Sequence, residues 1–110
     1  MSKYDFYRNP PKNREQIREY LTSWLEELDE KPTLEIEGET FIQEKGFRRA
    51  YCKHCVFRSL LTNEYVWWVF EPVFLQADDI SSFPKKRYPT FESLIEGAVE
   101  EHYVAWRLTE

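Results

Sequence analysis

The sequence predicts an α+β fold in the order helix, three- to four-stranded antiparallel sheet, helix, with the helices mainly on one face of the sheet. Two amphipathic patterns, within residues 13–28 and 90–106, predict the helices. The run 65–75 is almost entirely aromatic and β-branched at both odd and even positions, so it needs burial on both faces. This run predicts the central strand of the sheet. The length of 110 residues predicts a single domain, 1–110.

An aromatic and proline-rich arm, residues 1–12, precedes the first helix and predicts a docking arm or a short edge strand. The helix should begin after Asn13, a capping residue that is followed at the third position by Gln16. We expect the helix to continue to Leu28, with four acids at the negative end of its dipole: Glu26, Glu27, Asp29 and Glu30. Its apolar positions follow the i, i+3, i+4 spacing: Ile17, Tyr20, Leu21, Trp24, Leu25 and Leu28.

Extended segments fill the middle of the chain. Residues 33–37 alternate apolar and polar side chains, Gly38 permits a tight reversal into residues 40–44, and Gly46 is expected to break the second segment. The stretch 56–61 suits either strand or helix, and we interpret it as strand. The polar residues 62–64 then predict an antiparallel hairpin into the aromatic run, whose pairing on one side should stop near Pro72.

A long polar connection, residues 76–89, leads into the second helix. Thr90 is the expected N-cap, and Glu92 in the first turn complements the helix dipole. The apolar positions share one stripe along this helix: Phe91, Leu94, Ile95, Ala98, Val99, His102 and Trp106.

Composition excludes several classes of protein. No apolar stretch reaches the roughly 20 residues that cross a bilayer, and the first residues lack the apolar core of a signal peptide, so we expect a cytoplasmic protein without a membrane contact. With three glycines the chain offers no phosphate-binding loop, and it carries no hydrolase or metalloprotease motif. We therefore expect a protein that is not an enzyme and needs no cofactor.

One short motif carries chemistry: Cys52-Lys53-His54-Cys55. It resembles the C-x-x-C active site of thiol oxidoreductases, which implies a nucleophilic first cysteine. Alternatively, the two cysteines with His54 and His102 have the composition of a tetrahedral zinc site. A third interpretation, which we favour, is structural: two small, partly buried thiols on a strand with an exposed histidine.

Charge is segregated along the chain, whose net charge is −5. Residues 13–44 contain ten acids and three bases, whereas the basic island comprises 45–58 and 85–87. Segregated charge steers encounters with a partner, so the binding candidates are the arginines and lysines of the island with two tyrosines of the arm. These candidates are Arg48, Arg49, Arg58, Lys85, Lys86, Arg87, Tyr4 and Tyr7.

These patterns predict a binding module that inhibits or regulates a protein partner, of the kind found in phage, plasmid and toxin–immunity systems. Nucleic acid is the alternative partner, because Lys85, Lys86 and Arg87 precede the second helix in an element order similar to that of double-stranded-RNA-binding domains. The acidic first turn of that helix and the net charge oppose phosphate binding. A second copy of the chain, the arm or a ligand could cover the face of the sheet that the helices leave open.

Overall fold

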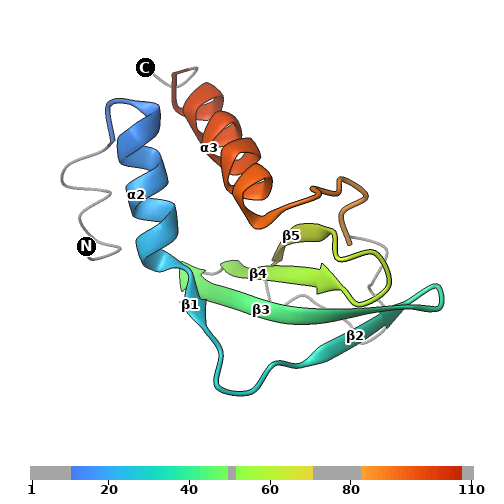
Figure 1. The fold of residues 1–110 in the computed structure, drawn as a ribbon. Coiled ribbons are helices and arrows are strands. Elements are labelled where there is room, and N and C mark those ends of the chain that lie inside the picture. Colours follow the sequence, from blue (N-terminus) through green and yellow to red (C-terminus); the bar gives the residue numbers. More distant parts are fainter. Residues whose placement is uncertain (1–10, 50–51, 71–82, 108–110) are drawn as a thin grey trace.

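The computed structural model of the chain describes residues 11–49, 52–70 and 83–107. It confirms the α+β class and the order helix, antiparallel sheet, helix. Within these ranges the sheet has five strands, and both helices pack on one of its faces (Figure 1). The elements are α2 (Arg14–Trp24), β1 (Glu26–Glu27), β2 (Thr33–Ile36), β3 (Glu39–Arg49), β4 (Cys52–Ser59), β5 (Tyr65–Phe70) and α3 (Phe91–Arg107).

Helix α2 begins where the sequence predicts and ends earlier than predicted. The Asn13 side chain accepts a hydrogen bond from the Gln16 amide at 2.9 Å, which caps the first turn. The helix stops at Trp24 and the backbone of Leu25 is extended, so the prediction of a helix as far as Leu28 was wrong. The two glutamates that follow form β1 instead and pair with Gly46 and Lys45 of β3. This pairing places acids beside Lys45 rather than at the negative end of a helix dipole, where they would be repelled.

The strands form one antiparallel sheet in the order β1-β3-β4-β5, and β2 pairs with β3 beyond the end of β1. The 56–61 stretch was correctly interpreted as strand through Ser59, where β4 ends, and the predicted hairpin into β5 is confirmed. The tight reversal at Gly38 is also confirmed: Glu37 and Gly38 have φ values of 52° and 81°, as in the two-residue turns that fit the twist of a hairpin. The expectation that Gly46 breaks the second segment was wrong, because this glycine lies within the continuous strand β3.

Gly46 lies where the backbones of β3 and β4 approach closely. A Cβ atom there would come within 2.9 Å of the backbone carbonyl oxygen of His54 and 2.7 Å of Nε2 in the Gln43 side chain. The glycine therefore serves the pairing of the two strands rather than a turn, and the register shifts nearby, between Gln43 and Lys45.

The prediction that residues 65–75 form the central strand was wrong. Strand β5 ends the described order of the sheet, and β3 and β4 lie at its centre. Both faces of β5 are nevertheless packed, because Trp67 contacts the helix-side cluster and Trp68 is buried in the cluster on the opposite face. Apolar residues on both faces of β5 thus indicate that both faces are covered, and they do not indicate that β5 lies between two other strands. Residues 71–75, including Pro72, lie outside the described residues.

Two hydrophobic clusters lie on opposite faces of the sheet. The helix-side cluster combines apolar residues of α2 and α3 with Phe47, Val56 and Leu25. The second cluster contains Phe41, Cys55, Phe57, Val66 and Trp68, with Leu34, Ile36 and Phe83 packed against it. The ring of Phe83 lies 4.9 Å from that of Phe41 and 5.3 Å from that of Trp68, so residues before α3 help to cover the face that the helices leave open.

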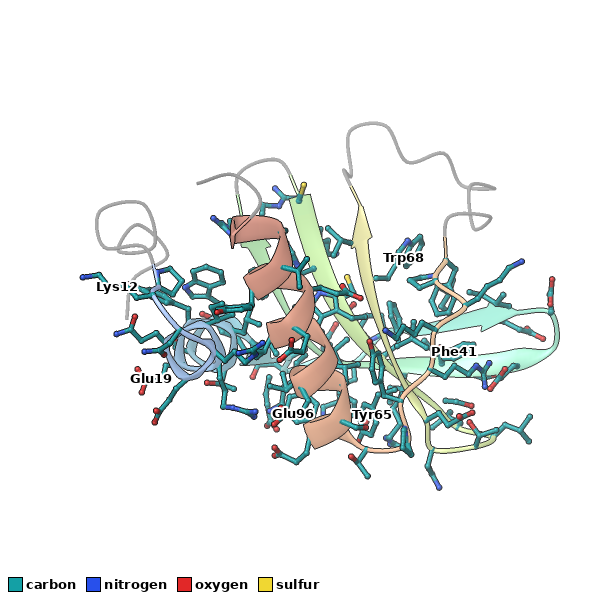
Figure 2. The ribbon with its side chains drawn as sticks, turned by 90° about the horizontal axis from the view of Figure 1, so that it is seen from above. Lys12, Glu19, Phe41, Tyr65, Trp68 and Glu96 are labelled. Atoms are coloured by element: carbon teal, nitrogen blue, oxygen red, sulfur yellow. The ribbon has the colours of Figure 1, made fainter. Side chains whose placement is uncertain are left out.

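The segment 83–88 runs along β5 and then enters α3 (Figure 2). Tyr88 and Tyr65 exchange two backbone hydrogen bonds, at 2.7 and 2.9 Å, which attach the segment to the start of β5. The ring of Tyr88 packs on Gly97 of α3, where a Cβ atom would lie 2.5 Å from the tyrosine hydroxyl. Thr90 then caps α3 as predicted, its hydroxyl accepting from the Ser93 amide at 3.1 Å.

Because the two clusters are separate, each should have its own critical tryptophan. Trp24 is 3 % exposed and Trp68 is 5 % exposed. We expect Trp24→Ala and Trp68→Ala each to lower the free energy of unfolding by about 3–5 kcal/mol, as large buried side chains do when truncated. Urea unfolding followed by circular dichroism measures both. Leu61→Ala, at a side chain 76 % exposed, is the control and should change little. A loss under about 1 kcal/mol for either tryptophan would show that its cluster is not part of the core.

Candidate functional site

The two cysteines of the C-x-x-C motif lie on opposite faces of the sheet. Side chains alternate along β4, and Cys55 is buried in the second cluster opposite Trp68. Cys52 pairs with Arg49, whose guanidinium lies over the Trp24 ring on the helix side. Both thiols are free. The strand therefore separates them, and this geometry removes the basis for a shared redox pair.

The motif is equally unsuited to a shared metal site. Among the described residues no group of three or more His, Cys, Asp or Glu side chains could hold a metal ion. Burial raises the pKa of the Cys55 thiol, with a smaller opposing effect of Lys53, so this thiol stays protonated and is a poor nucleophile. The favoured structural interpretation of the cysteines fits this arrangement.

His54 is buried, which corrects the expectation of an exposed histidine. It is 9 % exposed and stacks on Phe47, with ring centroids 4.3 Å apart and planes 10° from parallel. Its Nδ1 accepts a hydrogen bond from the Trp67 indole at 3.1 Å, which requires that nitrogen to be unprotonated. Burial, with smaller contributions from the nearby His102 and Arg49, lowers the pKa of His54 to about 4.

His102 lies in α3 on the helix side, where its Nδ1 is 2.8 Å from the carbonyl oxygen of Ala98. It also lines a hollow of about 210 Å³ between α3 and β5, together with Trp67 and Tyr88. The histidine is half-buried on the predicted apolar stripe of the helix. Its role is therefore to complete the wall between α3 and β5.

Several cations of the basic island are neutralised within the protein. Arg58 donates to Glu44 at 2.8 Å, and Lys31 donates to the same carboxylate at 2.9 Å. Burial would raise the pKa of Glu44, but the two hydrogen bonds outweigh it and the pKa is lowered. The Lys86 ammonium lies 3.9 Å from Glu101.

Arg87 is held on the face of the sheet opposite the helices. Its guanidinium pairs with Glu39 and Glu64 and lies 5.3 Å from the centre of the Phe41 ring. The hydrogen bond from Arg87, followed by that from Ser59, lowers the pKa of Glu39. Arg87 thus ties the segment before α3 to the β2–β3 hairpin.

The remaining candidates do not gather into one patch. Arg48 and Arg49 lie near the end of β3, whereas Arg58 pairs with Ile42, six residues earlier and about 20 Å away along the strand. Arg48 is opposite Lys53, on the face away from the helices, and Lys85 is exposed on the segment before α3. Tyr4 and Tyr7 lie outside the described residues.

One edge of the sheet carries exposed acids instead. All its members are solvent-exposed, and within the described ranges none of them takes part in an ion pair. They belong to β1, to the connection 28–32, to β2 and to the turn after β2, all on the same side of β3 (Figure 1). This acidic edge comprises Glu26, Glu27, Asp29, Glu30, Glu35 and Glu37. Four of the five residues 26–30 are acids, but the helical spacing that precedes them predicts the end of a helix there and not the edge of a sheet.

A hollow of about 400 Å³ lies beside the acidic edge, at the β2–β3 hairpin. Its apolar wall is formed by Ile36, Phe41, Phe83 and Pro84, and its charged rim by Glu37, Glu39, Lys85 and Arg87. Figure 2 shows Phe41 at the base of this hairpin. The volume is that of a small binding pocket, and the apolar wall suits a hydrophobic side chain.

Comparison with protein-family models, with curated proteins and with solved structures finds no match to this chain. No helix within the described residues is long and apolar enough to cross a membrane. The geometry of the molecule itself is therefore the basis for a functional proposal.

The buried, neutral His54 predicts a loss of stability in mild acid. The unfolded histidine binds a proton near pH 6.5, whereas the folded one does so near pH 4, so the unfolded state holds more protons between these values. Lowering the pH from 6.5 to 4 should therefore cost up to about 3 kcal/mol through this residue. The charged groups that act on the ring, His102 and Arg49, are both basic and do not offset the effect.

The measurement is the free energy of unfolding against pH for the native chain and for His54→Gln, which keeps an acceptor near Trp67 but does not titrate. The carboxylates Glu39 and Glu44 contribute to acid sensitivity in both proteins, so the difference between the curves isolates His54. Parallel curves between pH 6.5 and 4 would contradict a neutral buried histidine.

Proposed function

We propose that this chain is a protein-binding module that inhibits or regulates a partner protein, and that its acidic edge contacts a basic surface of that partner. The observation that carries the proposal is the contrast between the two charged regions. Arg58, Lys86 and Arg87 have carboxylate partners inside the molecule, whereas the six acids of the edge are exposed without ion pairs among the described residues.

A surplus of exposed charge of one sign speeds the encounter with a partner of opposite sign and orients it during approach. Glu26, Glu27 and Glu35 lie on strands paired with β3, Glu37 lies in the tight turn of the hairpin, and Asp29 and Glu30 lie in the short connection 28–32 between β1 and β2. The hollow next to them adds apolar surface, which a specific protein contact needs beyond charge.

The same charges disfavour the alternative of a nucleic-acid binder. Phosphate groups would meet the exposed acids, and three of the cations expected to bind them are already paired. A cytoplasmic location accords with two free cysteines in a small chain.

The proposal predicts that partner association depends on the charge of the acidic edge. Glu27→Gln, Asp29→Asn and Glu30→Gln together should lower the association rate constant about tenfold at low salt, because they remove part of the steering field. The effect should fade as salt is raised and the charges are screened. Partners are captured on the tagged chain from an extract of the native host, identified by mass spectrometry and then measured by surface plasmon resonance.

The matched control replaces three other exposed carboxylates, Glu15, Glu19 and Glu92, with glutamine. It changes net charge by the same amount but leaves the acidic edge intact, so its association rate should stay within about twofold of the native value. Equal losses in the two triple variants would show that net charge alone matters. Capture that disappears after nuclease treatment would replace the protein partner with nucleic acid.

A further inference from the structure

The backbone groups on the outer side of β2 have no partner strand among the described residues. The backbone amide of Gln43 donates to the carbonyl oxygen of Pro32 at 2.9 Å, which places this pair at a hydrogen-bonded position of the ladder, although Pro32 has no N–H and only accepts. Alternate positions repeat the pattern, so Leu34 and Ile36 turn their backbone groups toward β3. Thr33 and Glu35 then direct their N–H and C=O groups away from the sheet.

A second hydrogen bond supports this register. Thr40 is opposite Glu35, and its carbonyl oxygen accepts from Leu60 on the far side of β3 at 2.9 Å. The backbone carbonyl group of Thr40 therefore points away from β2, as the position of Thr40 in a non-hydrogen-bonded pair with Glu35 requires. Thr33 and Glu35 are exposed, and no other strand of the described sheet lies outside β2. An exposed edge of this kind accepts an added strand.

Side chains on the two faces of β2 differ in chemistry. Leu34 and Ile36 are half-buried against the second cluster, and Ile36 also walls the 400 Å³ hollow. Glu35 points to the other face and is exposed. The side chains of an added strand would alternate between these two faces. One set would lie near Leu34, Ile36 and the hollow, and the other set would lie near Glu35.

We propose that β2 is the docking edge for an extended segment of the partner protein, in which apolar residues alternate with lysine or arginine. The segment adds to the sheet as a strand next to Thr33 and Glu35. Its apolar side chains contact Leu34, Ile36 and the hollow, and its basic side chains contact Glu35. This inference rests on the protein-binding function proposed above and names the surface and the partner chemistry.

Charge argues against a second copy of the chain as the occupant. Two β2 strands paired edge to edge would bring the Glu35 carboxylates of both copies to the same face of a short four-residue strand, and each chain carries a net charge of −5. Like charges across strands destabilise pairing. The same carboxylates favour a basic segment.

The test compares Glu35→Pro with Glu35→Ala. Both variants remove the carboxylate, but only proline also removes the outward N–H donor, and proline is tolerated on an edge strand where that N–H faces solvent. The probe is a labelled eight-residue peptide in which lysine and valine alternate, with blocked ends. A peptide of the same composition, with its lysines and valines in two separate blocks, is the control for charge alone. Fluorescence anisotropy at low salt measures the affinities.

We expect the alternating peptide to bind the native chain and Glu35→Ala, and to bind Glu35→Pro at least about tenfold more weakly, because strand addition depends on main-chain hydrogen bonds. The block peptide should bind weakly to all three. Thermal melting must first show that both variants are folded, and Thr33→Pro, which removes the other outward donor, provides a second blocking variant. Equal affinity of the proline and alanine variants, or no binding of the alternating peptide, would overturn the docking edge.

The captured partner separates this inference from the function on which it rests. A partner that binds Glu35→Pro as well as Glu35→Ala, but loses affinity for the acidic-edge triple variant, would overturn strand addition and leave the protein-binding function standing. A partner that loses affinity for Glu35→Pro and also for the acidic-edge triple variant would support both strand addition and the protein-binding function. Dimerisation of the native chain that Glu35→Pro abolishes would identify a second copy as the occupant and contradict the proposed segment.

Discussion

The antiparallel pairing of β3 with β4 determines which side of the sheet each candidate residue occupies. It places Phe47, His54 and Val56 under the helices and Phe41, Cys55 and Phe57 on the opposite face. Gly46 permits the close approach of the two strands at the middle of this pairing. A shift of one residue would exchange the faces and place apolar side chains in water, so the register is strongly specified. The separation of the two thiols and the burial of His54 both follow from it.

The described strands pair with only part of the outer side of β3, and the proposed docking surface depends on this. Strand β1 pairs with Lys45 and Gly46 of β3, and β2 pairs with residues 39–42 of β3. Acids line both short strands, which protects them from pairing with copies of the same chain. At the other side of the sheet, Tyr88 pairs with Tyr65 and closes the start of β5. Among the described residues no strand pairs with the outer side of β2, which is why we propose it as the docking edge, with the flanking acids favouring a basic partner.

Local signals in the sequence were sufficient to predict most helices, strands and turns, but not the position of each strand in the sheet. Asn13 and Thr90 identified both helix starts, and Gly38 identified the hairpin, because a cap or a tight turn depends on neighbouring residues. The end of α2 was wrong because Glu26 and Glu27 pair with residues about 20 positions away, which no periodicity reveals. The position of β5 was wrong for a related reason: apolar residues on both faces report coverage, and Phe83, distant in the sequence, supplies part of that coverage.

The basic residues illustrate the same limit for function. Their clustering in the sequence predicts a binding patch, but Arg48 and Arg58 lie at distant points along the paired strands β3 and β4. In addition, Arg58 and Arg87 form ion pairs with Glu44 and Glu39 inside the molecule. Whether a charge is neutralised depends on contacts such as that between Arg87 and Glu39, which are 48 residues apart. Ion pairs of this kind cannot be inferred from the order of the residues, and the choice of the acidic edge as the proposed binding surface depends on them.

Strand β2 pairs with β3 on one side and has no partner among the described residues on the other, and amide hydrogen exchange measured by nuclear magnetic resonance distinguishes the two sides. In the free chain the amides of Leu34 and Ile36 should exchange at least about tenfold more slowly than those of Thr33 and Glu35, because only the former donate to β3. Rapid exchange confined to Thr33 and Glu35 is the predicted result. Equal protection of all four amides, or protection of Glu35 above Leu34, would contradict the open edge and with it the proposed docking of a partner strand.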